Sequence, residues 1–295
     1  MSDEELMEQE PNYIALTNDL LFHLVFTMNE KARISLISSL LNIPEAEILS
    51  ADVLNPLQWN ESIDTKLTVL DLKVHLNNDK YVLIEMQVRK FDYWTNRTLI
   101  YGCRDIDEQT KGSDFSYGKL QPVIQIAIMD YTLFPEHRKF FARYRVLDED
   151  DGYPFTDKLK FYVMDLTAMN DASDEAKSNG LVDWARAFSA RDWETVEKIN
   201  NAGVKEATKT METIMSSPEQ RQRILNRRKA LLDYKSEMEE AEARGEARGE
   251  VKGANMFSAL ISKLFSLNRL EDVRRCSEDE DYRNKLYAEF GLNKA

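Results

Sequence analysis

The sequence LTVLDLKVHLNNDKYVLIEMQV, residues 67–88, predicts a β-hairpin. Two runs rich in Leu, Val, Ile and Tyr, residues 67–76 and 81–88, flank the turn-forming sequence Asn-Asn-Asp at residues 77–79. Successive side chains of a strand point to opposite faces, so each run presents two different sets of side chains. The hairpin therefore decides which polar residues of this segment can meet.

The length of the turn sets the pairing of the two strands. With a three-residue turn, residue 76 pairs with residue 80, and Asp71 lies opposite Glu85. A two-residue turn would place Asp71 opposite Met86 and would send the two acids to different faces. The register is therefore a direct test of whether the acids form a pair.

Two opposed carboxylates repel each other, because directly paired positions have Cβ atoms about 4.5–5.5 Å apart. Such a pair needs a cation or a proton. One interpretation is a divalent-metal site, since Mg²⁺ binds one or two carboxylates, keeps several waters and accepts phosphate oxygens. The other is that Lys66 or Lys73 neutralises the pair on a solvated face. Spacing alone leaves both interpretations open.

The segments around the hairpin complete a mixed α/β pattern. Residues 18–42 carry apolar side chains at helical spacing, and residues 92–112 also predict a helix. Residues 123–129, VIQIAIM, form a nearly continuous apolar run that is typical of a strand buried on both faces. Residues 160–166 predict a further strand. This order of helix, strands, helix and strand predicts a mixed α/β sheet.

The C-terminal part of the sequence is helical in almost every signal. Residues 241–253 repeat every four positions. Each repeat contains a Glu, an Arg or Lys two positions later, and then a glycine, which is Gly245, Gly249 or Gly253. Each interior glycine costs a helix about 1 kcal/mol relative to Ala, and like charges four residues apart repel. We expect an assembly element, because a glycine stripe lets a second helix approach closely; a flexible linker is the alternative.

The predicted divisions are an acidic disordered tail (1–12), an α/β domain (13–166), a helical extension (167–240), the repeat (241–254) and C-terminal helices (255–295).

Composition limits the class of protein. The chain has 295 residues, of which 43% are hydrophobic and 31% charged, as expected for a globular protein. Its net charge of −13 argues against a protein that coats nucleic acid through bulk electrostatics. No run of 18 apolar residues occurs, and the first ten residues are acidic, so we expect no membrane association and a cytoplasmic location. The two cysteines form neither a disulfide framework nor a zinc motif.

These motifs together resemble a known nuclease core. The order of elements, with acids in the first helix and in the hairpin, is similar to the PD-(D/E)XK core in its αβββαβ order. More narrowly, five features resemble the PD-(D/E)XK family transposases, also called Rpn-type recombination-promoting nucleases. They are TNDLLF at 17–22, LDLK at 70–73, IEMQ at 84–87, Arg97 with Tyr101, and the Gly-rich four-residue repeat near the end. The resemblance covers about residues 13–165, with looser similarity through the repeat.

The resemblance implies a restriction-endonuclease-like fold with a helical C-terminal extension. It implies that Asp71 and Glu85 bind the metal and are catalytic, and that Asp19 is the acid that the first helix contributes to the metal. Gln87 stands where the wider superfamily usually has Lys, and Gln can position a water without supplying charge. On this comparison, Gln87→Lys should retain or raise activity.

The implied activity is Mg²⁺-dependent hydrolysis of DNA, with Mn²⁺ as a substitute, by an endonuclease associated with recombination or transposition. Arg97 and Tyr101 are candidates for phosphate contacts. The expected partners are DNA and further copies of the same chain, joined through the C-terminal helices. The alternative is a catalytically weak or inactive copy of the nuclease fold that acts as a protein-binding or assembly module.

Overall fold

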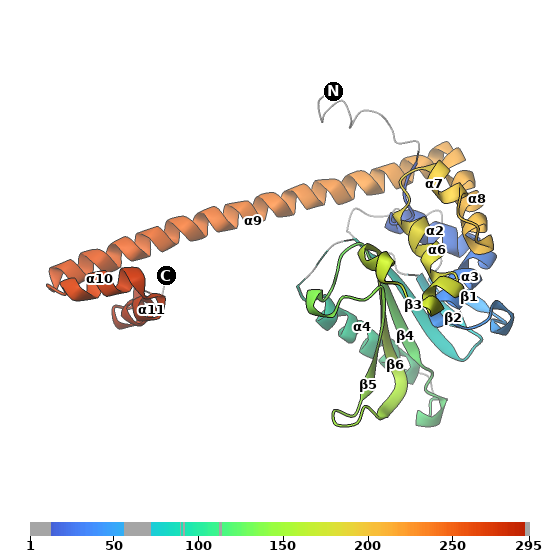
Figure 1. Cartoon of the computed structure of the whole chain (residues 1–295), viewed down its shortest axis with the longest axis horizontal. Coiled ribbons are helices and arrows are strands. Elements are labelled where there is room, and N and C mark those ends of the chain that lie inside the picture. The colour runs from blue at the N-terminus through green and yellow to red at the C-terminus, as the bar shows by residue number, and fades with distance from the viewer. Residues whose placement is uncertain (1–12, 56–71, 89, 91, 112–113, 293–295) are drawn as a thin grey trace. The chain divides into compact units, whose positions relative to one another are not determined.

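The computed structural model describes residues 13–55, 72–88, 90, 92–111 and 114–292. Within these residues, six strands form one mixed sheet in the order β1-β2-β3-β4-β6-β5 (Figure 1). The strands β1, β2 and β3 are antiparallel, β3, β4 and β6 are parallel, and β5 returns antiparallel to β6. The strand bounds are β1 Ala51–Val53, β2 Leu72–Leu76, β3 Lys80–Gln87, β4 Val123–Met129, β5 Phe141–Leu147 and β6 Pro154–Asp165.

The β2–β3 hairpin has a three-residue turn, the first of the two possibilities that the sequence leaves open. Leu76 pairs with Lys80, and the ladder continues in the same register to Leu72 opposite Ile84. Asn77 and Asn78 adopt φ values of 52° and 54°. Asn tolerates this left-handed conformation better than most residues, so the two asparagines close the turn without a glycine. Asp71 lies outside the described residues.

Helices cover both faces of the sheet (Figure 1). One face bears α2 and α3 together with later helices of the chain, and this layer holds the main hydrophobic core. The other face bears α4. The bounds are α2 Asp19–Met28, α3 Glu30–Leu41, α4 Trp94–Glu108, α5 Asp174–Ser178, α6 Leu181–Ser189, α7 Trp193–Glu197 and α8 Ala202–Ser216, with short 3-10 turns at Glu45–Glu47, Gln109–Lys111, Tyr117–Lys119, Pro135–His137 and Leu166–Asp171.

The predicted helical region 18–42 is divided into two helices by Asn29. Its side chain accepts a hydrogen bond from the backbone N–H of Ala32 at 3.0 Å and so caps α3. Asn18 caps α2 in the same way, through the N–H of Leu21 at 2.9 Å. The predicted strand at 123–129 coincides with β4. Strand β6 begins earlier than predicted, and β5 is an additional strand.

The chain divides into two packed units, the second of which begins at Lys229. The main core of the first unit includes helices α6 and α8 as well as the sheet, and its last buried member is Ile224. In the second unit a small core joins α9 Pro218–Ser266, α10 Leu270–Glu278 and α11 Glu280–Glu289. Helix α9 continues through the repeat at 241–253. Among the described helices, none combines the length and the apolar character needed to cross a bilayer.

Candidate nuclease site

Strand β3 presents two polar side chains to α4 at its C-terminal end. The alternation along the strand buries Ile84 and Met86 in the main core and turns Glu85 and Gln87 to the opposite face. Glu85 pairs across the sheet with Ala127 of β4, whose small side chain leaves room beside the carboxylate. Gln87 is 5% exposed. The sheet therefore holds a carboxylate and an amide next to each other in a largely buried position.

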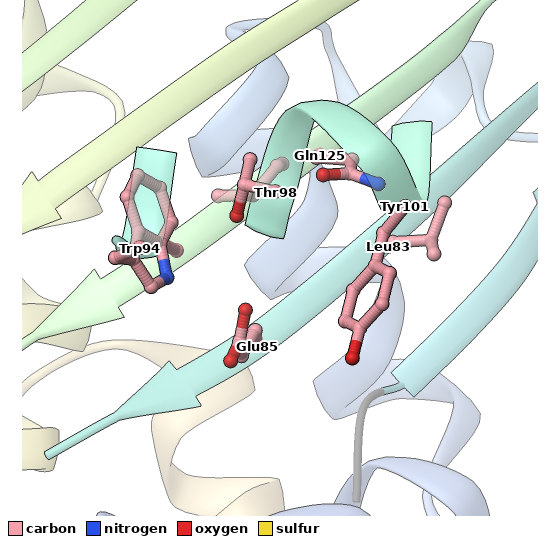
Figure 2. A pocket seen from close by; sticks show the side chains of 8 residues that line it. Leu83, Glu85, Trp94, Thr98, Tyr101 and Gln125 are labelled. Atoms are coloured by element: carbon pink, nitrogen blue, oxygen red, sulfur yellow. The ribbon is translucent and has the colours of Figure 1, made fainter. Parts of the chain in front are cut away.

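A small cavity lies between this part of the sheet and α4 (Figure 2). Its volume is about 30 Å³, which is enough for one or two water molecules. Glu85 lines it from β3, and Trp94, Thr98 and Tyr101 line it from α4. The indole N–H of Trp94 points toward the carboxylate of Glu85. The cavity is therefore bordered by one acid, two aromatic rings and a hydroxyl.

Arg97 of α4 joins the two polar residues of β3. One of its terminal guanidinium nitrogens donates to Glu85 Oε1 and also donates to Gln87 Oε1 at 2.9 Å. The Arg97 side chain is 26% exposed and the Glu85 side chain 13% exposed, so this ion pair is only partly screened by solvent. The guanidinium compensates the charge of Glu85 and orients the amide of Gln87.

Burial determines the direction of the Glu85 pKa. Desolvation raises the pKa of this carboxyl above its usual range, whereas the charge of Arg97 and, to a smaller extent, the nearby indole N–H of Trp94 act to lower it. The net direction is upward. A carboxylate held in this way gains from any additional positive charge beside it, because the charged form is the one that burial disfavours.

Close packing of α4 on the sheet fixes the position of Arg97. The side-chain amide of Gln125 is oriented so that both of its polar atoms have partners on α4. Its nitrogen donates to the backbone carbonyl of Thr98, and its oxygen accepts from the backbone N–H of Gly102, each at 2.8 Å. A Cβ on Gly102 would lie 2.8 Å from Leu159 Cδ1, so the helix approaches the sheet closely at this residue. Tyr101 follows one turn after Arg97, and the two side chains form a cation–π contact at 5.9 Å.

Asp19 lies in a separate ion pair. Its carboxylate accepts from Arg227 of α9, at 3.1 Å from Nε and 2.6 Å from a terminal nitrogen. Both side chains are largely buried, Arg227 at 6% and Asp19 at 18% exposure. Asp19 also occupies the first turn of α2, where a negative charge complements the helix dipole. The structure therefore gathers Glu85, Gln87, Arg97 and Tyr101 around α4 and gives Asp19 a partner of its own.

The donor set on β3 suits a hard cation. Among the residues that the structure describes, no group of three His, Cys, Asp or Glu side chains converges as a complete metal cage. Mg²⁺ does not need one, since it is commonly held by one or two carboxylates and completes its shell with water and phosphate oxygens. The carboxylate of Glu85 and the amide oxygen of Gln87 are both oxygen donors of the kind that Mg²⁺ prefers. The residues present therefore fit such an ion.

Two aromatic residues of this region were not among the residues that the sequence indicated. Trp94 is 4% exposed and packs with Ala127 and Met129, and Tyr131 packs against the same cluster. The available signal was positional: Tyr131 follows the buried strand 123–129 by two residues, and the C-terminal ends of parallel neighbouring strands meet at one edge of a sheet.

One comparison with known proteins identifies the family of this chain. A family model described as PD-(D/E)XK nuclease family transposase matches residues 16–241. Neither the curated proteins nor the solved structures gave a match. The matched region includes the sheet, α4 and the polar residues of β3, and the described order of two helices, three antiparallel strands, a helix and a parallel strand is that of the αβββαβ core. The chain belongs to the PD-(D/E)XK nuclease family transposases.

Proposed function

We propose that this protein is a Mg²⁺-dependent DNA endonuclease whose site is built on Glu85 and Gln87 of β3. The proposal rests on the pair itself: a largely buried carboxylate and a buried amide lie next to each other on the sheet face that α4 covers, in a chain of a nuclease family. Mn²⁺ would substitute for Mg²⁺, because both accept carboxylate, carbonyl and water ligands.

Asp71 is the proposed second acid. The register of the hairpin supports this assignment, since every described pair from Leu76–Lys80 to Leu72–Ile84 has residue numbers that sum to 156, and Asp71 and Glu85 have the same sum. Asp71 and Glu85 would hold the ion. Asp19 is the proposed third ligand, and its carboxylate would exchange its contact with Arg227 for the ion.

Each residue of the site has a distinct proposed task. A bound Mg²⁺ supplies Lewis-acid polarisation of the phosphate and a more acidic water. The amide of Gln87 orients the attacking water through its carbonyl oxygen or N–H₂ group. The fork of donors on Arg97 matches two phosphate oxygens, so this side chain neutralises Glu85 in the free protein and contacts the DNA backbone in the complex. Tyr101 lies beside Arg97 and steadies it through the ring contact.

The wider setting of the activity is also proposed. The family description includes transposases, which supports a role in DNA recombination or transposition. A cytoplasmic location is consistent with that role. We further propose that the second unit joins copies of the chain, because the repeat in α9 carries a stripe of Glu at 242, 246 and 250 and a stripe of Arg or Lys at 244, 248 and 252. In a parallel helix pair the Glu stripe of one copy would lie beside the Arg or Lys stripe of the other, on either side of the glycines.

One observation favours the alternative of a catalytically weak binding module. Arg97 already engages both Glu85 and Gln87, and the site lacks the Lys that is usual in the superfamily. In such a protein the polar group on β3 would only hold α4 on the sheet. DNA binding without cleavage would be the signature of this alternative.

The test is plasmid cleavage with Mg²⁺, with Mn²⁺, and after chelation with EDTA. Glu85→Gln and Asp71→Asn replace a charged ligand by an amide of the same shape, and Gln at position 85 can still accept from Arg97. Loss of an outer-shell partner typically costs 10- to 100-fold, so we expect loss of a direct ligand to cost about 100-fold or more. The control is Glu149→Gln, an exposed acid in the β5–β6 turn.

Three outcomes decide the matter. Cleavage that needs metal and is lost in both site variants, with an unchanged thermal transition and a fully active Glu149→Gln, supports the endonuclease. Cleavage by Glu85→Gln at the wild-type rate removes Glu85 from the site. A wild-type protein that binds DNA and leaves it intact with either metal ion favours the binding module.

A further inference from the structure

The hydroxyl group of Tyr131 lies buried beside the candidate site. Tyr131 follows Met129, the last residue of β4, and Met129 pairs with Gln87, the last residue of β3. Ala127 and Met129 belong to the cluster under Trp94, and the Tyr131 ring packs against that cluster. The ring therefore lies just beyond the C-terminal edge of the two central strands, on the face that also carries Gln87.

Packing does not account for the oxygen of this side chain. The Tyr131 hydroxyl is withdrawn from solvent and has no hydrogen-bond partner among the residues that the structure describes. An unsatisfied buried polar group costs about 1–3 kcal/mol, and most such groups in native proteins are paired. A Phe at this position would give the same ring packing without that cost. The unpaired hydroxyl therefore suits a hydrogen-bond partner that is present only when a ligand is bound.

The charges around the phenol keep it a donor. Burial raises the pKa of Tyr131, and the negative charges of Glu85 and Asp130 raise it further, while Arg97 acts in the opposite direction. The group is thus protonated at neutral pH. Its electrostatic neighbours include both members of the ion pair that the proposed function uses, which ties the phenol to that site.

We infer that Tyr131 is a positioning residue whose hydroxyl donates a hydrogen bond to a phosphate oxygen of DNA bound at the Glu85 and Gln87 site. This inference rests on the proposed function. A phosphate oxygen is a strong acceptor, and Arg97 already donates to one carboxylate oxygen of Glu85 and to the amide oxygen of Gln87. The protein has a net charge of −13, and a neutral hydroxyl can bind a phosphate oxygen of the DNA backbone through a hydrogen bond alone. The purely structural alternative is a tyrosine used only for its ring.

Tyr131→Phe separates these alternatives, because it removes the oxygen and keeps the ring. The matched control is Tyr144→Phe on β5, another tyrosine that packs against the Trp94 cluster. Binding of a short fluorescein-labelled duplex is followed by anisotropy in Ca²⁺, and a gel confirms that the duplex stays intact. Thermal unfolding of the full-length variants is followed in parallel, and cleavage with Mg²⁺ is measured separately.

We expect Tyr131→Phe to unfold at the same or a higher temperature than wild type and to bind DNA about 10-fold more weakly, which corresponds to about 1.4 kcal/mol. Tyr144→Phe should bind as wild type does. Equal affinity of Tyr131→Phe and wild type would overturn the inference, as would an equal loss in the two Phe variants or a wild-type protein that does not bind DNA. A wild type that binds but does not cut would refute the proposed endonuclease alone; a selective loss of binding in Tyr131→Phe would still support the inference.

Discussion

Arg97 gives a single shared donor to the two polar residues that end β3. The alternation of apolar and polar side chains in the sequence was enough to place Glu85 and Gln87 on one face of a strand. Their common contact could not be derived in this way, because Arg97 lies on a helix and its reach depends on how closely α4 packs at Gly102. The strand pattern therefore predicts that Glu85 and Gln87 lie together, whereas their contact with Arg97 depends on the packing of α4.

The contact with Arg97 changes the expectation for Gln87→Lys. Lys has no acceptor, and its ammonium group would lie beside the guanidinium of Arg97 in a buried position. Loss of a buried hydrogen-bond partner costs about 1–3 kcal/mol, so we expect the free energy of unfolding to fall by that amount and cleavage to weaken rather than to rise. Urea unfolding and the plasmid assay measure the two effects.

Gln87→Glu serves as the comparison, since it keeps an oxygen that can accept from Arg97. We expect its free energy of unfolding to lie closer to wild type than that of Gln87→Lys. If Gln87→Lys proves as stable and as active as wild type, the shared contact has no energetic importance.

Among the strands, those with a strong local signal were predictable from the sequence, and the exposed ones were not. The position of the β2–β3 turn was predictable because Asn77 and Asn78 fit a conformation that few residues tolerate, whereas its three-residue length was not. Strand β4 was predictable because it is buried along its whole length. Strand β5, FARYRVL, is an exposed edge strand with two arginines, and its apolar signal is correspondingly weak. The sequence did not predict the first residues of β6 for the same reason, since residues 154–158 are not buried.

The packing of α3 against α8 depends on a glycine. A Cβ on Gly203 would lie 2.2 Å from the Cβ and Oγ of Ser35, and Ser35 is itself buried. Gly203→Ala should therefore push the helices apart and lower the free energy of unfolding by about 1–3 kcal/mol, in spite of the better helix propensity of Ala. Thermal or urea unfolding of the full chain measures the loss.

The control for this change is Gly118→Ala, because nothing lies within 4 Å of the position that its Cβ would take. It should leave the unfolding transition nearly unchanged. A Gly203→Ala variant that unfolds at a higher temperature than wild type would show that the two helices adjust without cost.

At the scale of the whole molecule, contacts between distant parts of the chain were the least accessible to sequence reasoning. The ion pair of Asp19 with Arg227 joins residues 208 positions apart, and nothing in either local pattern indicates it. Likewise, the helices after residue 167 share the main core with the sheet, although their sequence signal only identified them as helical. The repeat at 241–253 lies within one continuous helix, against its intrinsic preference.

Truncation after Glu240 tests the proposed role of the second unit. The main core has its last buried member at Ile224, and the core of the second unit is formed by residues from Phe257 onward. The truncated chain should therefore keep the first unit folded and should lose self-association. Sedimentation velocity of the full and truncated chains measures the change, and circular dichroism verifies the fold. A full-length protein that sediments as a monomer, or an oligomer that survives truncation, would refute assembly through the repeat.

The register of the β2–β3 hairpin also restricts how this family of sequences can vary. Leu72, Val74 and Leu76 are fully buried, whereas Lys73 and His75 point to the other face. Insertion or deletion of one residue within β2, between position 72 and the turn, would turn the residues before it to the opposite face unless a bulge absorbed the change, and would remove the proposed pairing of position 71 with Glu85. Gains and losses of two residues keep the parity. Among related sequences, the number of strand residues between each proposed acid and the turn should therefore change in even steps, whereas the turn itself can change by a single residue.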